Sequence, residues 1–179
     1  MININIRNMK NILFFIIVLF TFSFNLFSQN KKHDSICEDA IYVKTDDYEG
    51  VIFGPKCLKL LIIKDGDTID APRWIPTMQD IENAEKLIRK YVTKKSKHYL
   101  VNQGNGCPII YQNFDKYVRQ YYGTYNEKDE KILNVNFLWR DSKFIDDWKI
   151  KGIAVFDGCS FFWEISVNMK KKKCFNYWL

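Results

Sequence analysis

The sequence predicts an α+β domain in which one long amphipathic helix packs on a curved antiparallel sheet that a β-hairpin precedes. Apolar residues recur with a helical period over residues 78–95, and short β-rich segments separated by turn signals follow. A helix followed by consecutive strands buries its apolar stripe against one face of a sheet. Hydrophobic residues make up 47% of the chain and charged residues 27%, which is enough apolar material for the core of one domain.

The first residues carry the pattern of a secretory signal peptide. Arg7 and Lys10 precede an apolar run at residues 11–20, and the chain then becomes polar. We predict that residues 1–28 are removed during export by cleavage after Ser28, with Ser23 as a second candidate site. The alternative is a retained membrane anchor, because a membrane-spanning helix needs about 20 apolar residues and this run approaches that length.

Processing defines the expected domain limits and compartment. Residues 29–40 are polar and are expected to form a flexible segment, and residues 41–179 a single domain. The expected location is the periplasm, the cell envelope or the extracellular space, with no membrane span after processing. An envelope or extracellular protein is the expected partner. The net charge of +6, which falls to +4 without Arg7 and Lys10, is too small to indicate nucleic-acid binding.

Two β-rich segments, at residues 41–48 and 57–63, precede the helix. Asp65 and Gly66 follow the second segment, and a β-rich pattern resumes at Thr68. Because both residues of an Asp-Gly pair tolerate positive φ, this pattern predicts a β-hairpin.

The helix predicted over residues 78–95 has a defined start and a defined apolar face. Thr77 is a favourable N-cap, and Asp80 completes an acidic variant of the capping box. Glu85 is expected to form an exposed ion pair with Arg89, four residues later. The apolar face consists of Ile81, Ala84, Leu87, Ile88, Tyr91 and Val92.

A second hairpin is predicted from residues 116–125 and 131–139. Asp129 lies in the intervening turn and is expected in the left-handed conformation. A three-residue loop would place Tyr121 directly opposite Val135.

Three further short strands are expected at residues 153–156, 161–167 and 174–179, after a charged connection at residues 140–151. Four consecutive lysines at residues 170–173 predict a turn that also protects a sheet edge from pairing with other chains.

Aromatic residues make up 16% of the chain, more than one helix can cover. Strand alternation places Trp163 on one side of the sheet and Phe162 on the other. Either the hairpin region at residues 41–70 covers the second face, or that face binds a partner through Phe162, Tyr122 and Trp178.

The five cysteines all follow the leader, and an exported protein can form disulfides among Cys37, Cys57, Cys107, Cys159 and Cys174. An odd number leaves at least one cysteine free or paired with another chain. The chain has no CxxC pair, and we expect neither a metal nor a cofactor site. The one enzymatic hypothesis is a hydrolase in which Cys107 is the nucleophile and His98 its base.

Several short motifs occur together: residues 73–81 with Ala84 and Glu85, residues 117–123 with Asn134 and Asn136, and Asp157-Gly158 with Trp163, Val167 and Asn168. In this combination the chain resembles a group of small, uncharacterised exported bacterial proteins, and the resemblance implies no particular activity. The order of helix and strands is similar to that of cystatin-like domains. Residues 103–106, however, do not match the hairpin motif of protease-inhibiting cystatins.

These observations together favour a non-enzymatic binding or inhibitor-like module. A small secreted Cys/His hydrolase and a structural accessory of the cell envelope are the alternatives from other functional classes.

Overall fold

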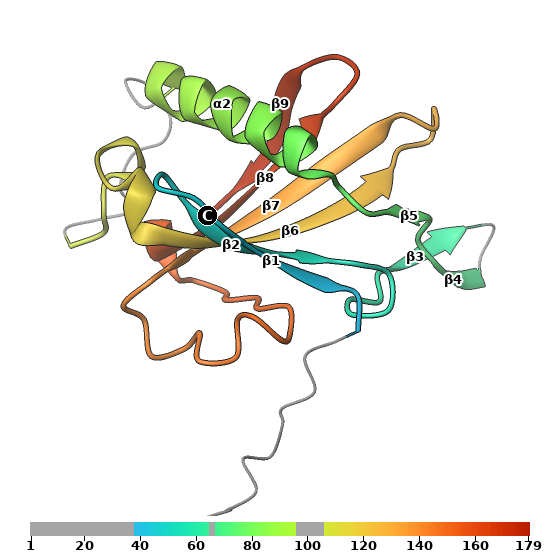
Figure 1. Cartoon of the computed structure of the whole chain (residues 1–179), viewed down its shortest axis with the longest axis horizontal. Coiled ribbons are helices and arrows are strands. Elements are labelled where there is room, and N and C mark those ends of the chain that lie inside the picture. Colours follow the sequence, from blue (N-terminus) through green and yellow to red (C-terminus); the bar gives the residue numbers. More distant parts are fainter. Residues whose placement is uncertain (1–37, 65–66, 96–105) are drawn as a thin grey trace, which may run out of the picture. The chain divides into compact units, whose positions relative to one another are not determined.

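The computed structural model describes residues 38–64, 67–95 and 106–179. The predicted signal peptide, residues 29–37 of the predicted flexible segment, and His98 lie outside these ranges. One α-helix packs against a mostly antiparallel mixed sheet (Figure 1), which confirms the predicted fold class. None of the helices within the described ranges has the length and hydropathy that crossing a membrane requires.

The strands and the helix are, in chain order, β1 (Ala40–Lys44), β2 (Glu49–Phe53), β3 (Leu61–Lys64), β4 (Asp67–Asp70), β5 (Arg73–Trp74), α2 (Met78–Lys95), β6 (Tyr117–Tyr125), β7 (Lys131–Trp139), β8 (Phe162–Asn168) and β9 (Lys173–Trp178). Short 3-10 turns precede two of the strands, and they are η1 (Ile110–Gln112), η2 (Phe114–Lys116) and η3 (Cys159–Phe161).

The main sheet has the strand order β1-β2-β6-β7-β8-β9, and β5 also pairs with β6. Strands β2 and β6 run parallel, with Val51 opposite Gln120, so the prediction of a wholly antiparallel sheet is wrong at this pair. The connection between these strands contains α2, and a crossover of this kind returns the chain in its original direction.

The first hairpin of the structure is β1–β2, and it breaks the strand predicted over residues 41–48. Thr45 explains the break, because its hydroxyl accepts a hydrogen bond from the Tyr48 amide at 3.1 Å and its own amide donates to the Tyr48 carbonyl at 2.9 Å. The hairpin predicted around Asp65 and Gly66 is confirmed by the β3–β4 register. It forms a separate two-stranded sheet.

Helix α2 has the predicted bounds and the predicted capping box. The Asp80 amide donates to the Thr77 hydroxyl at 3.2 Å, and the Thr77 amide donates to the Asp80 carboxylate at 2.9 Å. Ile81, Ala84 and Ile88 are fully buried against the sheet.

The core between α2 and the sheet is strongly aromatic. The rings of Phe137 and Trp163 stack with centroids 3.8 Å apart, and Tyr117 meets both edge-on. Tyr117 also donates a hydrogen bond to the Ser160 carbonyl at 2.6 Å, which satisfies its buried hydroxyl.

The β6–β7 hairpin has the predicted register, with Tyr121 opposite Val135, and Asp129 has the expected positive φ of 53°. Three of the four lysines at residues 170–173 lie in the turn between β8 and β9, as the sequence predicts, and Lys173 is the first residue of β9. Lys172 has a positive φ there, and the Lys171 amide is bonded to the Asn168 side chain.

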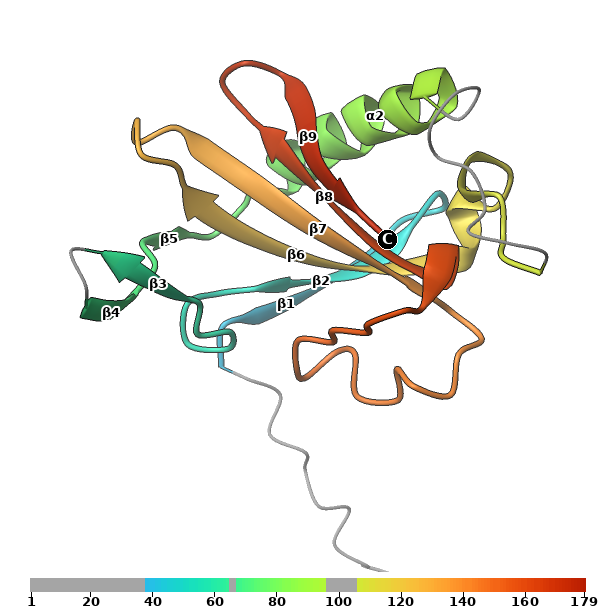
Figure 2. The ribbon, with the colours of Figure 1, turned by 180° about the vertical axis from the view of Figure 1, so that it is seen from behind.

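The strand predicted at residues 153–156 is absent, and this segment has no regular structure. Strand β6 lies between β2 and β7, strand β7 between β6 and β8, and strand β8 between β7 and β9, so none of these three has a free edge. The segment belongs to a long connection, residues 140–158, that lies below the sheet on the side away from α2 (Figures 1 and 2).

Candidate functional site

The cysteine pairing decides what thiol chemistry the chain can perform. Cys107 and Cys159 form a disulfide, and Cys57 is also disulfide-bonded. Cys107 therefore has no free thiol in this state, and the proposed base His98 lies outside the described residues. Cys174 is the free cysteine of the described part, and it is 7% exposed. Burial raises the pKa of its thiol to about 12, which makes it a poor nucleophile.

The three residues predicted to form a binding face have different environments. Phe162 is 8% exposed, because residues of the 140–158 connection pack on it, and Trp178 is 64% exposed. The Arg73 guanidinium lies over the Tyr122 ring at 5.7 Å, and burial raises the pKa of this tyrosine to about 12. Phe162 and Trp178 thus share one region, and Tyr122 lies farther along the sheet beneath Arg73.

The covering of the second sheet face comes from a segment that the sequence did not indicate. Ile145 and Trp148, in the connection predicted to be charged, pack with Phe162, Val118 and Leu138. The hairpin region at residues 41–70, which the sequence analysis considered as the cover, also takes part in this cluster. It contributes Val51 and Phe53 from within the sheet, with Cys57 and Leu58 at the edge of the same cluster.

Two amide side chains attach the 140–158 connection to the sheet. Gln120 donates hydrogen bonds to the carbonyls of Trp148 and Lys151 at 2.7 and 2.8 Å. Its own carbonyl accepts from the Ile153 amide at 3.0 Å, and Asn136 donates to the Ile153 carbonyl at 2.6 Å. These bonds satisfy backbone groups that a strand neighbour would otherwise satisfy, which explains why residues 153–156 need not pair as a strand.

The attached connection forms one wall of a surface depression, which we call the outer groove. The groove consists of two adjoining hollows of about 740 and 300 Å³. Both hollows are lined by residues 153–156 and by Phe162, and the smaller one also by Trp178 and Glu164.

Three large aromatic side chains stand exposed at the outer groove. Phe156 is 89% exposed, Phe144 66% and Trp178 64%. Single exposed apolar residues are ordinary, but three at one depression form a surface that a partner could bury.

The charge of the groove is opposite to that of the chain. The described lining residues include Glu164 and Asp157 but no lysine or arginine, although the whole chain has a net charge of +6. Glu164 lies opposite Trp178 in the β8–β9 register, and partial burial raises the pKa of its carboxyl group. No residue of the described ranges forms an ion pair or hydrogen bond with this carboxylate, so it can accept donors from a ligand.

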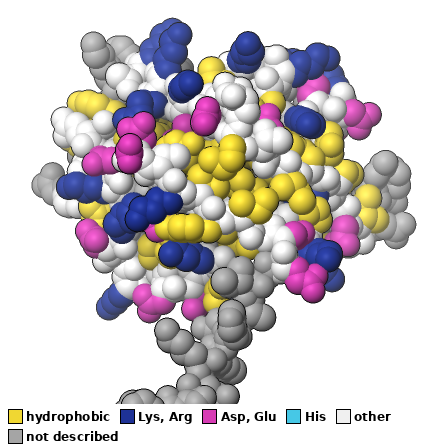
Figure 3. Space-filling view, viewed as in Figure 1, with side chains coloured by type: hydrophobic (Ala, Val, Ile, Leu, Met, Phe, Trp, Pro, Cys, Tyr) yellow, Lys and Arg dark blue, Asp and Glu magenta, His cyan; other side chains and the backbone are white. Residues whose placement is uncertain are grey.

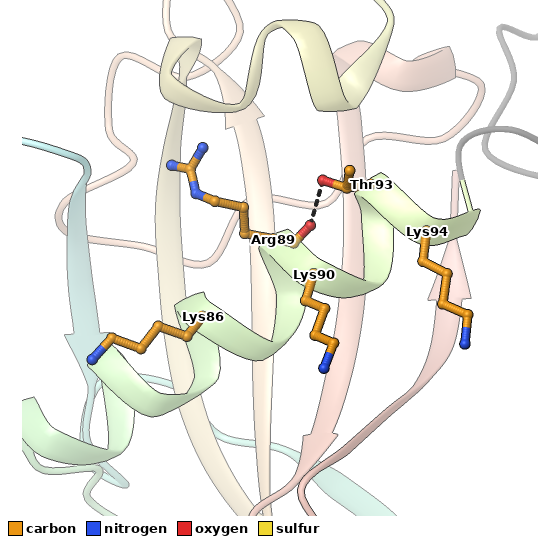
Figure 4. Close-up of a pocket in the computed structure, with 5 residues that line it drawn as sticks. All are labelled: Lys86, Arg89, Lys90, Thr93 and Lys94. Carbon is orange, nitrogen blue, oxygen red and sulfur yellow. Dashed lines mark hydrogen bonds between the residues drawn. The ribbon is translucent and has the colours of Figure 1, made fainter.

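A basic hollow of about 660 Å³ lies along the exposed side of α2. Figure 4 shows that Lys90 and Lys94 extend to one side of the helix whereas Arg89 extends to the other. These cations do not converge on one ligand position, and basic residues near the end of a helix also stabilise it through the helix dipole.

A buried ionic centre lies between α2 and the sheet, and the sequence analysis missed it. Glu85 is 6% exposed, so the predicted exposed pair with Arg89 is wrong. Its carboxylate lies 3.4 Å from Nε of Arg119 and accepts a hydrogen bond from the Tyr121 hydroxyl at 2.7 Å. Burial raises the pKa of Glu85, although Arg119 and Tyr121 oppose this change. The sequence did contain an indication that Glu85 is buried. Glu85 lies four residues after Ile81 and therefore falls within the apolar stripe of the helix.

Within the described residues, no group of three or more His, Cys, Asp or Glu side chains could hold a metal ion. Figure 3 shows how the surface side chains are distributed. Apolar side chains gather in a band across one face of the molecule, and charged side chains surround this band. In comparisons with known proteins, no family model, curated protein or solved structure matches the chain.

Proposed function

We propose that this chain is an exported, non-enzymatic binding module that holds a segment of an envelope or extracellular protein in the outer groove. The observation that carries the proposal is the exposure of Phe144, Phe156 and Trp178 at one depression. Partners bury aromatic side chains of this kind as the anchors of an interface.

The chemistry of the groove indicates the kind of segment it fits. Its walls are apolar, and its charges are the carboxylates of Glu164 and Asp157. A partly desolvated carboxylate gains most from a cationic donor. The matching segment therefore combines apolar side chains with lysine or arginine.

Two observations support a partner outside the cytosol. The leader has the composition of a signal peptide, and the Cys107–Cys159 disulfide is compatible with an oxidising compartment. The disulfide also joins the start of η3 to the segment before η1, which fixes one end of the 140–158 connection.

The test is a binding assay with fluorescein-labelled peptides in which leucine and phenylalanine alternate with lysine or, in matched peptides, with glutamate. We expect the lysine peptides to bind at least roughly tenfold more tightly than the glutamate peptides, which corresponds to about 1.4 kcal/mol. The Phe156→Ala/Trp178→Ala double variant should lose binding. Glu164→Gln should keep apolar binding but reduce the preference for lysine.

The matched control is Ile75→Ala, because Ile75 is 46% exposed and does not line the groove. It should leave the affinity unchanged. Binding that survives the loss of Phe156 and Trp178, or that Ile75→Ala weakens equally, would show that the groove is not the recognition site. A structural accessory with no affinity for such peptides would give no signal with either peptide set.

A further inference from the structure

The main sheet ends at two strands, and their outer edges differ. Strand β9 ends one side, and its pairing with β8 is irregular between Glu164 and Ser166, with a positive φ of 47° at Asn176. An irregular edge of this kind resists the addition of another strand. Strand β1 ends the other side (Figures 1 and 2), and its register with β2 is unbroken from Ala40 to Lys44. Among the described strands, none pairs with the outer edge of β1.

Backbone groups of β1 point outward along this edge. The Thr45 amide donates to the Tyr48 carbonyl at 2.9 Å, and the Gly54 amide donates to the Asp39 carbonyl at 3.1 Å. In this register the odd-numbered residues of β1 exchange hydrogen bonds with β2. The even-numbered residues of the strand direct their N–H and C=O groups away from β2, and they are Ala40, Tyr42 and Lys44. A row of such groups can pair with a further strand.

The side chains beside this edge are apolar and partly exposed. Ile41 and Tyr42 are each 47% exposed, and they lie on opposite faces because side chains alternate along a strand. Ile41 shares the face of Val43, which belongs to the core beneath α2. Tyr42 lies on the other face, where its ring centroid is 6.3 Å from that of Trp148. A strand added to β1 would therefore bury apolar surface on both faces of the sheet.

The charges at the two ends of β1 make this edge complementary to itself. Two antiparallel copies of the strand, related by a two-fold axis, pair even-numbered residues with even-numbered residues. With the axis at Ile41, Glu38 lies opposite Lys44 of the second copy, and both side chains are exposed. The two Ile41 side chains then meet across the axis, as a directly opposed pair that brings side chains close together.

Other positions of the axis fit less well. An axis at Tyr42 places Glu38 opposite Asp46 of the second copy, and like charges in opposed positions destabilise a strand pair. An axis at Val43 centres the pairing on a side chain that is only 2% exposed and has little further surface to bury. The axis at Ile41 therefore combines opposite charges with the burial of an exposed side chain.

We propose that two copies of this chain associate by antiparallel pairing of β1 about a two-fold axis at Ile41, which joins their main sheets into one. Each contact then occurs twice, as in any isologous interface. The pairing is independent of the outer groove, because that groove is lined by residues of β8 and β9 toward the other end of the sheet.

Sedimentation velocity of the purified protein tests the proposal at concentrations between about 10 and about 500 µM. We expect the sedimentation coefficient to rise with concentration and to give a dimer dissociation constant below about 200 µM at low ionic strength. Protein that stays monomeric over the whole range would overturn the proposal.

A charge exchange between Glu38 and Lys44 tests the register. Lys44→Glu should raise the dissociation constant at least roughly fivefold, because a carboxylate then faces Glu38 at both ends of the paired strands. The Glu38→Lys/Lys44→Glu double variant should restore most of the affinity, since it only reverses the pair. The ion pair of Glu38 with Lys56, which this variant also removes, is exposed and contributes little. A double variant as weak as Lys44→Glu would contradict the register.

A proline at Tyr42 tests the backbone pairing. The Tyr42 amide points away from β2, so Tyr42→Pro removes a donor of the proposed dimer and none of the β1–β2 hydrogen bonds. Tyr42→Ala is the matched control, because it removes the same ring and its bond to Glu49 but keeps the amide. We expect Tyr42→Pro to dimerise at least roughly tenfold more weakly than Tyr42→Ala. Equal dissociation constants for the two variants would show that the copies associate through another surface.

Discussion

Replacing Arg119 tests the buried ionic centre most directly. Arg119 is fully buried, and its guanidinium donates to the Phe114 carbonyl at 2.9 Å and to the Tyr117 carbonyl, while Nε faces Glu85 at 3.4 Å. Arg119→Met keeps an unbranched side chain of similar length, which can still pack against the ring of Phe137. The change therefore removes charge and donors with little loss of volume.

The expected loss follows from the partners that remain. Two buried carbonyl groups lose a charged donor, and each unpaired group costs about 1–3 kcal/mol. Glu85 is also left without its cation, and breaking a buried ion pair from one side costs about 3–5 kcal/mol in total. We expect the free energy of unfolding of Arg119→Met to fall by about 4 kcal/mol, a large part of the 5–15 kcal/mol typical of a domain.

Urea denaturation monitored by circular dichroism measures this loss of unfolding free energy. A double-mutant cycle then shows how much of the loss comes from the interaction between Arg119 and Glu85. Glu85→Gln alone should also destabilise the protein, whereas the double variant should lose at least about 1 kcal/mol less than the sum of the two single losses. Arg140→Met is the control, because its ion pair with Glu49 is partly exposed and should contribute about 1 kcal/mol or less. A loss below about 1 kcal/mol in Arg119→Met, or additive losses in the cycle, would refute this account of the centre.

Three further predictions concern the disulfide, the free thiol and acid stability. The Cys107→Ala/Cys159→Ala double variant should lose about 4 kcal/mol of unfolding free energy in urea denaturation, because the bond spans 52 residues and restricts the unfolded chain; a loss below about 1 kcal/mol would contradict this. Cys174 should resist N-ethylmaleimide at about pH 8 in the native protein and react once guanidinium unfolds it, since burial raises its pKa to about 12; rapid native labelling would show that the site opens. A hydrogen bond from Asn168 is the main cause that lowers the pKa of Glu130 to about 2 from 4.5. The ionised Glu130 carboxylate therefore stabilises the fold above pH 4.5, and this contribution is lost as the pH falls toward 2. Glu130→Gln should flatten the plot of unfolding free energy against pH in this window, and an unchanged slope would contradict the prediction.

Local chemistry explains what the sequence determined by itself. The helix over residues 78–95, its capping box and the register of Tyr121 with Val135 depend on neighbours within a few residues or across one turn. Asp129 has its predicted backbone conformation for the same reason. Alternation along β8 also placed Trp163 and Phe162 on opposite faces correctly.

Only the tertiary structure decided the features that depend on distant partners. The place of Glu85 in the apolar stripe indicates burial, but only the fold shows that Arg119, 34 positions later, places a guanidinium beside it. The parallel pairing of β2 with β6 follows from the crossover through α2, and the 140–158 connection becomes a cover and a groove wall because Gln120 binds its backbone. Each of these contacts joins residues far apart in the chain, whose proximity depends on the arrangement of the whole fold. Periodicity and turn chemistry report the local conformation of the backbone, and they carry no information about which distant group will meet it.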